Sequence, residues 1–391
     1  MSALWVVWLK EVRESLRDRR VLINAFALGP FLGPLLFVGM INYIVTRELS
    51  RAEQPLPVAV IGAEHAPNLV DALRQAGLEV RPAEADPERA VREQRIDLAL
   101  RIAPEYGDDW RAGRLATVEI IYDSSRTDGN AQVARLRGML GGYSRSIGAM
   151  RLLARGVSPE VTVPLSIVDR DQATSTSRGA ALFAMLPYFI IFTAFMGGMF
   201  LAIDATAGER ERQSLEPLLI NPVPRWQVLG GKLAATTSFS FVSVLLSVGA
   251  FMLAAWIMPT QKLEMSVNLG WQFCRVVLPV MLPLVVLLSI LQTLVAAYSK
   301  NFREAQTALG LLQLVPMVPS IALVIAPIKI VTWMYAVPLL GQQVTIMRML
   351  RGEPVGAEQV LVCIGCTLAA AVLVWLAARR VYESERLAVA G

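Results

Sequence analysis

The sequence has few of the residues on which most enzyme and metal chemistry depends. Its 391 residues include one histidine, His65, three cysteines and five lysines, and only 18% of the residues are charged. A Ser/His/Asp relay would have to use His65, and a zinc site needs more ligands than these residues provide. Cys363 and Cys366 lie inside an apolar run, so we interpret them as small packing residues. We therefore expect no catalytic residue and no metal site in this chain.

The distribution of charge argues against a nucleic-acid partner, although the pI is about 9.3. Residues 47–178 contain no lysine and carry 18 arginines against 19 acidic residues. The excess of positive charge therefore belongs to the rest of the chain, where it clusters at 10–20, 210–232, 300–303 and 379–386. Clusters of this kind beside apolar runs are typical of the cytosolic side of membrane proteins.

The mean hydropathy of +0.49 and the long apolar runs predict a membrane protein. A run of 18 or more apolar residues is long enough to cross a hydrocarbon core of about 30 Å. The first run is too long for the core of a cleavable signal peptide, and no cleavage motif follows it. We predict six spans, at 22–45, 180–203, 229–258, 274–298, 305–326 and 360–378.

The charge clusters also predict the topology. With both termini in the cytosol, six crossings place every basic cluster on the cytosolic side. Residues 331–350 are apolar enough for a seventh span, but that span would export Arg379 and Arg380. We therefore expect residues 328–350 to form a re-entrant outer segment.

The predicted fold is an α-helical polytopic membrane protein with six transmembrane helices and a large external mixed α/β domain between spans one and two. An interfacial amphipathic N-terminal helix occupies residues 1–20, and the first transmembrane helix occupies residues 21–46. The extracytoplasmic domain covers residues 47–178, and spans two to six lie in residues 179–391. Within the external domain we expect strands at 57–61, 78–81, 96–102, 116–122 and 162–169, and helices at 68–76, 87–94 and 128–155, the last closed by Gly156.

The crowded charges of residues 208–226, GERERQSLEPLLINPVPRW, stand between two predicted spans. Ser214 can cap a short helix over residues 215–221, with Pro217 in its first turn and Pro222 ending it. Such a helix presents several aliphatic side chains to a partner, whereas a simple solvated connector does not need them. Glu209 at the membrane boundary has two possible roles, an exposed ion pair with Arg212 or a nearby basic residue, or a stop on a cation path that begins at Asp204, and we expect the ion pair.

Residues 204–233, DATAGERERQSLEPLLINPVPRWQVLGGKL, resemble the signature of the type-2 ATP-binding-cassette exporter permeases, in particular the NatB-like Na⁺-efflux branch. The chain departs from the family pattern at Gln213, where glycine is common, and at Pro217. The resemblance covers the whole chain and implies an exporter built from two permease subunits, identical or different, and two cytosolic ATPase subunits. It implies a cytosolic coupling helix at 209–224, in a bacterial inner membrane, with these ATPase-coupling residues: Glu209, Arg210, Glu211, Arg212, Leu215, Glu216, Leu218 and Leu219.

The chain lacks the Gly-x-x-x-x-Gly-Lys-Ser/Thr loop that binds ATP phosphates. Gly231-Lys232 is its one Gly-Lys pair, and Leu233 follows it. We therefore expect ATP and Mg²⁺ on the partner ATPase and no cofactor on this chain.

The substrate is left open between Na⁺ and an amphipathic drug, peptide or lipid. Polar residues at membrane depth either line a pathway or join helices by hydrogen bonds. The candidate substrate path consists of Asp204, Asn24, Asn42, Gln292, Gln306 and Gln313. A different class of function is a membrane-anchored receptor or enzyme acting through residues 47–178, where Tyr122–Arg126, YDSSR, is the one hydrolase-like stretch.

Overall fold

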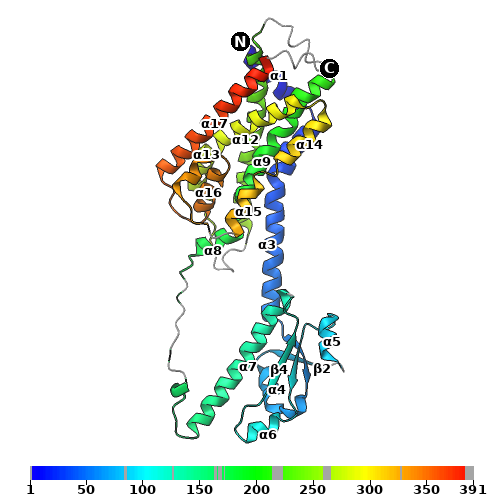
Figure 1. Ribbon diagram of the computed structural model, residues 1–391, viewed down its shortest axis with the longest axis vertical. Coiled ribbons are helices and arrows are strands. Elements are labelled where there is room, and N and C mark those ends of the chain that lie inside the picture. The colour runs from blue at the N-terminus through cyan, green and yellow to red at the C-terminus, as the bar shows by residue number, and fades with distance from the viewer. Residues whose placement is uncertain are drawn as a thin grey trace. The chain divides into compact units, whose positions relative to one another are not determined.

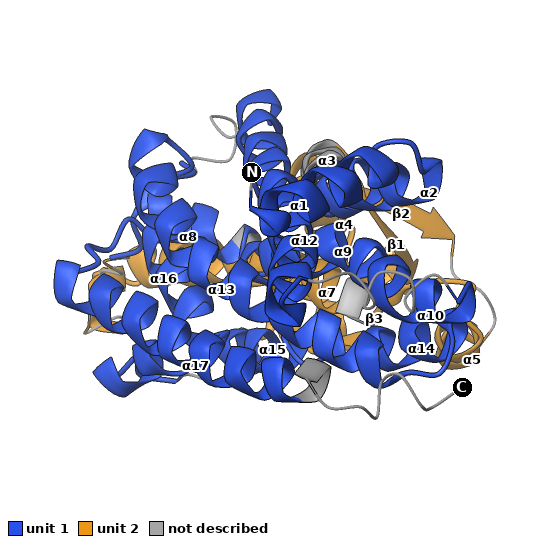
Figure 2. Ribbon diagram, turned by 90° about the horizontal axis from the view of Figure 1, so that it is seen from above, with its two compact units in different colours: residues 1–43, 172–391 blue, residues 44–171 orange. Residues whose placement is uncertain are grey.

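The computed structural model (Figure 1) describes residues 2–82, 86–125, 127–162, 165, 170, 172–213, 223–258, 266–325 and 328–383. The chain forms two compact units, coloured separately in Figure 2. The helical unit comprises Met1–Tyr43 and Gln172–Gly391, and the α/β unit comprises Ile44–Asp171. Each unit is described below by itself.

Six helices of the described residues are long and apolar enough to cross a membrane, and each coincides with one predicted span. Three of them are single helices from end to end. The other three are built from several consecutive elements. The six are Arg19–Tyr43 (α2 Arg19–Leu22, η1 Ile23–Leu28 and the start of α3 Gly29–Glu53), Leu186–Glu211 (α9 Leu186–Ile203, η4 Asp204–Gly208 and α10 Glu209–Glu211), α12 Arg225–Ile257, α13 Trp271–Tyr298, Phe302–Ile325 (α14 Phe302–Leu312 and α15 Met317–Ile325) and Ala357–Arg380 within α17 Ala357–Glu383.

Two of the spans differ from the sequence prediction in how they are built. The second span begins at Leu186 rather than at residue 180, because a separate short helix, α8 (Ser175–Leu182), precedes it. The fifth is broken between α14 and α15, and Pro316 lies in the break. Proline has no backbone N–H to donate to the preceding turn, which accounts for a break at this position.

Helix α9 occupies the centre of the helical unit and packs mainly on α12 and α13. Gly197 and Gly198 of α9 allow this close packing, because a side chain at Gly197 would collide with Ser243 of α12. Thr193 of α9 donates a hydrogen bond to the backbone oxygen of Gly29 (2.8 Å). Small and hydroxyl-bearing residues at such contacts are typical of helices that pack in a membrane.

Residues 328–350 do not form one long helix. They contain a short 3₁₀ helix, η6 (Thr332–Ala336), and the 11-residue helix α16 (Leu340–Leu350). Eleven helical residues extend about 16 Å, roughly half of a hydrocarbon core. Helix α16 is nevertheless buried, and Gln343 donates to the backbone oxygen of Pro316 (2.8 Å).

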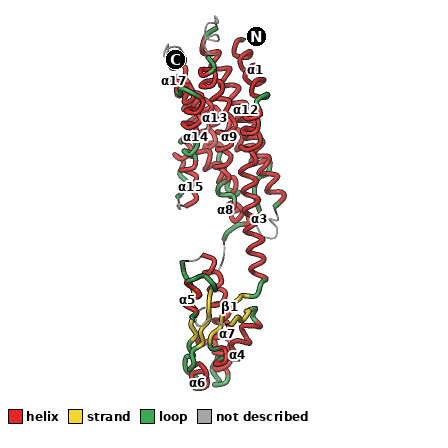
Figure 3. The backbone as a smooth tube through the Cα atoms, turned by 90° about the vertical axis from the view of Figure 1, so that its right-hand side faces the viewer, coloured by secondary structure: helices red, strands yellow, loops and turns green. Residues whose placement is uncertain are grey.

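The α/β unit contains one four-stranded sheet, whose strands are yellow in Figure 3, in the order β2-β1-β3-β4. Strands β1 (Leu56–Ile61), β2 (Leu78–Pro82) and β3 (Leu98–Ile102) are parallel, and β4 (Val118–Tyr122) is antiparallel to β3. The long helix α7 (Thr127–Leu153) runs beside the sheet in Figure 1, and its Leu136 is fully buried in the core. This unit also contains the helices α4 (Pro67–Gln75), α5 (Pro87–Arg92) and α6 (Tyr106–Arg111).

Four predicted strands and three predicted helices of this unit are present within a few residues of the expected bounds. Gly156 follows α7 with φ +70°, the left-handed conformation that ends many helices. Helix α6 was not predicted. The fifth predicted strand, 162–169, begins in a 3₁₀ helix, η3 (Pro159–Thr162), and most of its remaining residues lie outside the described part of the chain.

Candidate functional site

The charged segment after the second span begins in a π-helical turn. Helix α9 passes into η4 at Asp204 and then into the single turn α10. Gln213, where the family pattern favours glycine, has φ +55°, so the backbone adopts the conformation that glycine accommodates most easily. Residues 214–222, which include Leu215, Glu216, Leu218 and Leu219 and the short helix expected over residues 215–221, lie outside the described residues.

Glu209 lies inside the protein and belongs to a buried network of four charged residues. Lys232 of α12, only 2% exposed, donates to Glu209 (2.6 Å) and to Glu11 of helix α1 (Ala3–Ser15) at 3.3 Å. Lys10 contacts the same two carboxylates, Glu209 at 3.0 Å and Glu11 at 3.2 Å. Three of the four side chains are buried, and Lys10, 39% exposed, lies at their edge, so each buried carboxylate has cationic partners that offset its loss of hydration. We call these four residues the buried charge network.

The buried charge network fastens the N-terminal helix to the end of the second span. Lys232 also donates to the backbone oxygen of Ala205 in η4 (2.7 Å), so its ammonium group joins three segments of the chain. Burial opposes the charge of Lys10, but the carboxylates of Glu11 and Glu209 outweigh it and raise the pKa of Lys10. Lys10 is therefore a cation at neutral pH.

Close packing of α1 on α12 brings these charges together. Gly231 faces α1, and a Cβ atom at this position would lie 2.7 Å from Cβ of Val7 and 2.8 Å from the backbone oxygen of Leu4. Any side chain at residue 231 would push α1 away from α12. The Gly231-Lys232 pair thus combines a close helix contact with the buried cation next to it.

The other three charged residues of the segment each contact a different element. Arg210 donates to the backbone oxygens of Ala297 (2.7 Å) and Ser299 (3.1 Å), at the C-terminal end of α13. Glu211 accepts a hydrogen bond from the backbone N–H of Phe302 at the start of α14 (3.1 Å). Acidic groups are favourable at helix N-termini and basic groups at C-termini, so both contacts complement the helix dipoles.

Arg212 pairs with Asp204 (2.8 Å) across the π-helical turn. Glu209 pairs with other basic residues, Lys232 and Lys10, and not with Arg212. The expectation that this pair is exposed is wrong, because Glu209 is only 6% exposed.

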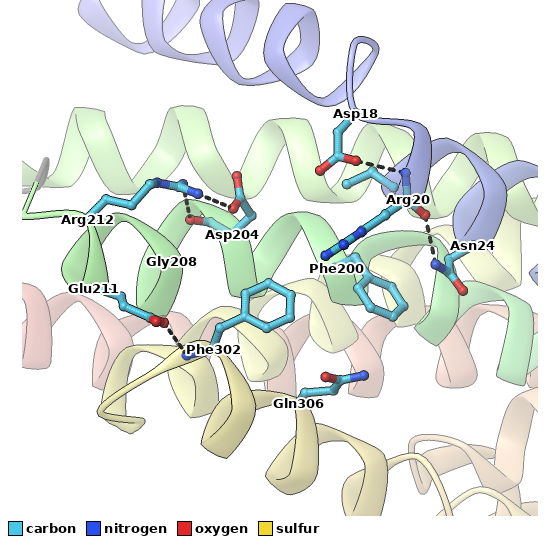
Figure 4. Close-up of a pocket in the computed structure, with 11 residues that line it drawn as sticks. Asp18, Arg20, Asn24, Phe200, Asp204, Gly208, Glu211, Arg212, Phe302 and Gln306 are labelled. Atoms are coloured by element: carbon cyan, nitrogen blue, oxygen red, sulfur yellow. Dashed lines mark hydrogen bonds and ion pairs between the residues drawn. The ribbon is translucent and has the colours of Figure 1, made fainter.

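A cavity of about 620 Å³ lies beside this segment, between the first, second and fifth spans (Figure 4). Asn24 of η1 and Asp204 and Gly208 of η4 line it, so both π-helical segments of the described chain border the same space. Single π-helical turns inside longer helices are frequent at functional sites. Phe200, Phe302 and Gln306 complete a lining that mixes aromatic, amide and charged groups.

The structure brings together three of the six residues predicted to form a substrate path. Asn24, Asp204 and Gln306 line the cavity. Gln292 is fully buried and donates to the backbone oxygen of Phe195 (2.6 Å), which joins α13 to α9. Asn42 is exposed on α3, and Gln313 follows α14, so neither lines the cavity.

The sequence reasoning missed Lys10, Glu11 and Lys232 as functional candidates. The one available signal was Lys232 itself, a lysine inside a predicted span in a chain with only five lysines. An ionisable residue at membrane depth is expected to have a partner. Nothing in the sequence identified that partner as a residue of the N-terminal helix.

Among the described residues of the α/β unit, His65 lies far from the serines of the YDSSR stretch. His65 follows β1 and lies near Ile102, since both surround the position where a Cβ of Gly62 would sit. Ser124 follows Tyr122, which pairs with Leu98 at the other end of β3. The two sites are separated by the length of β3, about 13 Å at 3.3 Å per residue.

The hydrogen bonds of Ser125 indicate that the YDSSR stretch is a turn and not a catalytic site. The N–H and the hydroxyl of Ser125 both donate to the carboxylate of Asp123, at 3.0 and 2.7 Å, which is the hydrogen bonding of a turn. In the part of the chain that the structure describes, no three His, Cys, Asp or Glu side chains cluster as metal ligands do.

Residues 29–379 match the model of the ABC-2 family transporter protein. The chain is 24% identical over 319 residues to the ABC transporter permease protein NatB of Bacillus subtilis (strain 168), a similarity that covers 80% of each chain. The chain thus belongs to the ABC-2 transporter family and is a membrane subunit of an ABC transporter.

Proposed function

We propose that this permease exports its substrate by responding to a separate cytosolic ATPase that docks on residues 209–224. The anchoring of the four consecutive charged residues from Glu209 to Arg212 carries the proposal. Each of them contacts a different part of the helical unit. Glu209 contacts α12 and α1, and Arg210 contacts the end of α13. Glu211 contacts the start of α14, and Arg212 contacts η4. A helix that follows this segment would pass a displacement to several spans at once. A flexible connector would not.

The same proposal places both termini and residues 209–224 in the cytosol of a bacterium and the α/β unit outside the inner membrane. The basic clusters of the helical unit support this orientation through the positive-inside rule. Residues 328–350 would then form a re-entrant segment on the outer side, in line with the short, buried α16. ATP and Mg²⁺ would bind the ATPase, and a second permease copy would complete the transporter.

For the substrate, we favour an amphipathic molecule over Na⁺. Asp204 is the carboxylate nearest to the middle of the second span, and its ion pair with Arg212 supplies the charge that a bound cation would otherwise supply. The cavity beside it also combines aromatic and polar groups, and its 620 Å³ suits a small organic molecule.

Docking is tested by changing the two leucines predicted to face the ATPase. Leu218→Asp combined with Leu219→Asp should release the ATPase from the purified complex while the permease remains folded in the membrane. Leu153→Asp, at an exposed leucine of α7, is the matched control and should retain the ATPase. Wild-type recovery of the ATPase with the double variant would contradict docking at this segment.

The substrate is tested by transport with the permease and its ATPase in liposomes. Na⁺ and amphipathic drugs are offered in parallel, with Asp204→Asn as the variant. We expect ATP-dependent movement of an amphipathic compound and none of Na⁺. Movement of Na⁺ that Asp204→Asn abolishes would overturn this choice of substrate and leave the docking proposal intact.

A further inference from the structure

An open apolar groove lies between α12, α13 and α17 of the helical unit. Its volume is about 370 Å³, and the three helices that form it pack on one another (Figure 1). Among the described residues that line it, none is charged and Thr237 has the one hydroxyl. Such a lining suits a hydrocarbon, because a polar group placed there would lose its hydration without gaining a partner.

The groove extends along α12 for about half the thickness of a membrane. Its lining on α12 runs from Trp226 to Thr237, a rise of about 16 Å at 1.5 Å per residue. The hydrocarbon core is about 30 Å thick, so this length is the depth of one leaflet. On α17, Leu368, Val372 and Trp375 recur at the spacing of one helix face and form the opposite wall. A single acyl chain therefore fits the groove lengthwise.

Two tryptophans mark one end of the groove as the membrane interface. Trp226 is the second residue of α12 and is 41% exposed, and Trp375 lies near the C-terminal end of α17. Tryptophan is enriched where hydrocarbon meets lipid headgroups. The amphipathic helix α1 reaches the groove at this end, because its Leu4 lies beside Gly230, one turn from Trp226. A lipid whose chain lies in the groove would have its headgroup at the level of these tryptophans.

Positive charge follows the tryptophans on both walls. Arg225 immediately precedes Trp226, and Arg379 lies four residues after Trp375, on the same face of α17 and one turn closer to its end. Arg379 is exposed, and its five N–H donors allow it to bind a phosphate in addition to a partner within the protein. Basic side chains at the end of a membrane helix attract anionic headgroups.

We propose that the groove binds one acyl chain of an anionic phospholipid and that Arg379 binds the phosphate of its headgroup. Ordinary lipids cover the outer faces of every span, but a groove surrounds a chain on several sides and so gains more van der Waals contact than a flat face does. The walls thus retain the chain, and Arg379 selects the headgroup. Because the chain also contacts Leu4, its binding stabilises the packing of α1 on α12. The inference holds whatever the permease transports and wherever its ATPase docks.

The test counts the lipids that remain on purified full-length permease in detergent. Phosphatidylglycerol and phosphatidylcholine with identical oleoyl chains are offered in equal amounts, and native mass spectrometry records which lipid stays bound. We expect one lipid per chain, with phosphatidylglycerol preferred about fivefold, the factor that one arginine contributes at a membrane surface. Since the chains are identical, the preference reports the headgroup alone.

Two arginine variants assign this preference. Arg379→Gln should abolish it. Arg380→Gln is the matched control, because Arg380 is the next residue, is also exposed, and lies about 100° further around α17. Phosphatidylglycerol should also raise the unfolding temperature of the wild-type permease more than phosphatidylcholine does, and Arg379→Gln should lose that difference.

Two tryptophan variants locate the chain. Val372→Trp places a large ring in the groove and should abolish retention of the lipid. Leu373→Trp adds the same ring at the adjacent residue, which does not line the groove, and should leave retention unchanged. Val372 and Leu373 are 55% and 68% exposed, so neither change should unfold the permease, and thermal unfolding verifies this.

The proposal is overturned if no lipid is retained or if the two lipids are retained equally. It is also overturned if Arg380→Gln acts as Arg379→Gln does, because general surface charge would then be the cause, or if the two tryptophan variants behave alike. A lipid-free dimer that Val372→Trp dissociates would show that a second copy occupies the groove, and the proposal would again be wrong. None of these results bears on whether the ATPase docks at residues 209–224.

Discussion

In the helical unit Lys232 reaches Glu11, 221 residues earlier in the chain, whereas in the α/β unit Arg74 pairs with Asp71, three residues away. The first pair is 2% and 5% exposed, and the second is 56% and 63% exposed. In the α/β unit charge is plentiful and most of its pairs are local and solvated. In the helical unit charge is scarce, and the buried charge network joins elements distant in sequence.

The difference shows where charge has a structural role in this protein. An exposed pair contributes about 0–1 kcal/mol, because water solvates both partners nearly as well when they are apart. A buried pair whose partner is removed leaves an uncompensated ion, at a cost of about 3–5 kcal/mol. The charges that hold the N-terminal helix to the second span should therefore be far more sensitive to substitution than those of the α/β unit.

The largest effect is expected for Lys232→Met. The change removes the cation that contacts Glu11, Glu209 and the backbone oxygen of Ala205, and leaves two buried carboxylates with only the half-exposed Lys10. The free energy of unfolding should fall by about 3–5 kcal/mol. Thermal unfolding of the purified permease in detergent measures the loss.

A double variant distinguishes loss of the ion pair from general misfolding. Lys232→Met with Glu209→Met replaces a buried ion pair by apolar groups, a change that is often neutral or stabilising. The double variant should therefore recover part of the stability. Additive losses in the two substitutions would argue that Lys232 and Glu209 do not act as a pair.

A smaller effect is expected on the N-terminal helix, where Glu11 and Glu14 form a matched pair of sites. Glu11 is 5% exposed and contacts Lys232 and Lys10, whereas Glu14 is 60% exposed and contacts Lys10 (3.4 Å). Glu11→Gln should lower stability by about 1–3 kcal/mol and Glu14→Gln by less than about 0.5 kcal/mol. Equal unfolding temperatures of the two variants would contradict the burial of this network.

The sequence predicted the features that depend on long patterns. Six apolar runs predicted six long helices, because a helix that crosses a membrane needs about twenty consecutive apolar residues, which the sequence shows directly. Alternating strands and capped helices likewise predicted most of the α/β unit, while α6 has too few residues, from Tyr106 to Arg111, to leave a clear periodic signal.

The partner of Glu209 could not be predicted, for a physical reason. Sequence spacing relates Glu209 to Arg212 by assuming a regular α-helix, but η4 is a π-helical turn. An extra residue in one turn rotates everything that follows by about 100° around the helix axis. Glu209 therefore faces Lys232, and only the packing of α1 and α12 at Gly231 reveals this contact.

Within the α/β unit the buried phenol of Tyr106 predicts a pH effect. Burial raises the pKa of Tyr106 to about 12 from its ordinary value near 10, so the folded unit holds this proton more tightly than the unfolded chain does. Its contribution to stability is complete below pH 10 and is lost as the pH rises from 10 to 12. Tyr106→Phe should reduce the slope of unfolding temperature against pH in that range. An unchanged slope would show that other groups cause it.

The smallest effect is expected for Arg74→Gln in the α/β unit. The pair with Asp71 has an N–O distance of 3.0 Å, close to that between Lys10 and Glu209, so distance alone would assign the two pairs similar importance. Burial separates them, because water replaces the lost partner of Asp71 at almost no cost. The free energy of unfolding should change by less than about 0.5 kcal/mol. Added salt should not increase this difference, because salt screens exposed charges. A loss as large as that of Glu11→Gln would mean that burial is not what makes the charges of the helical unit important.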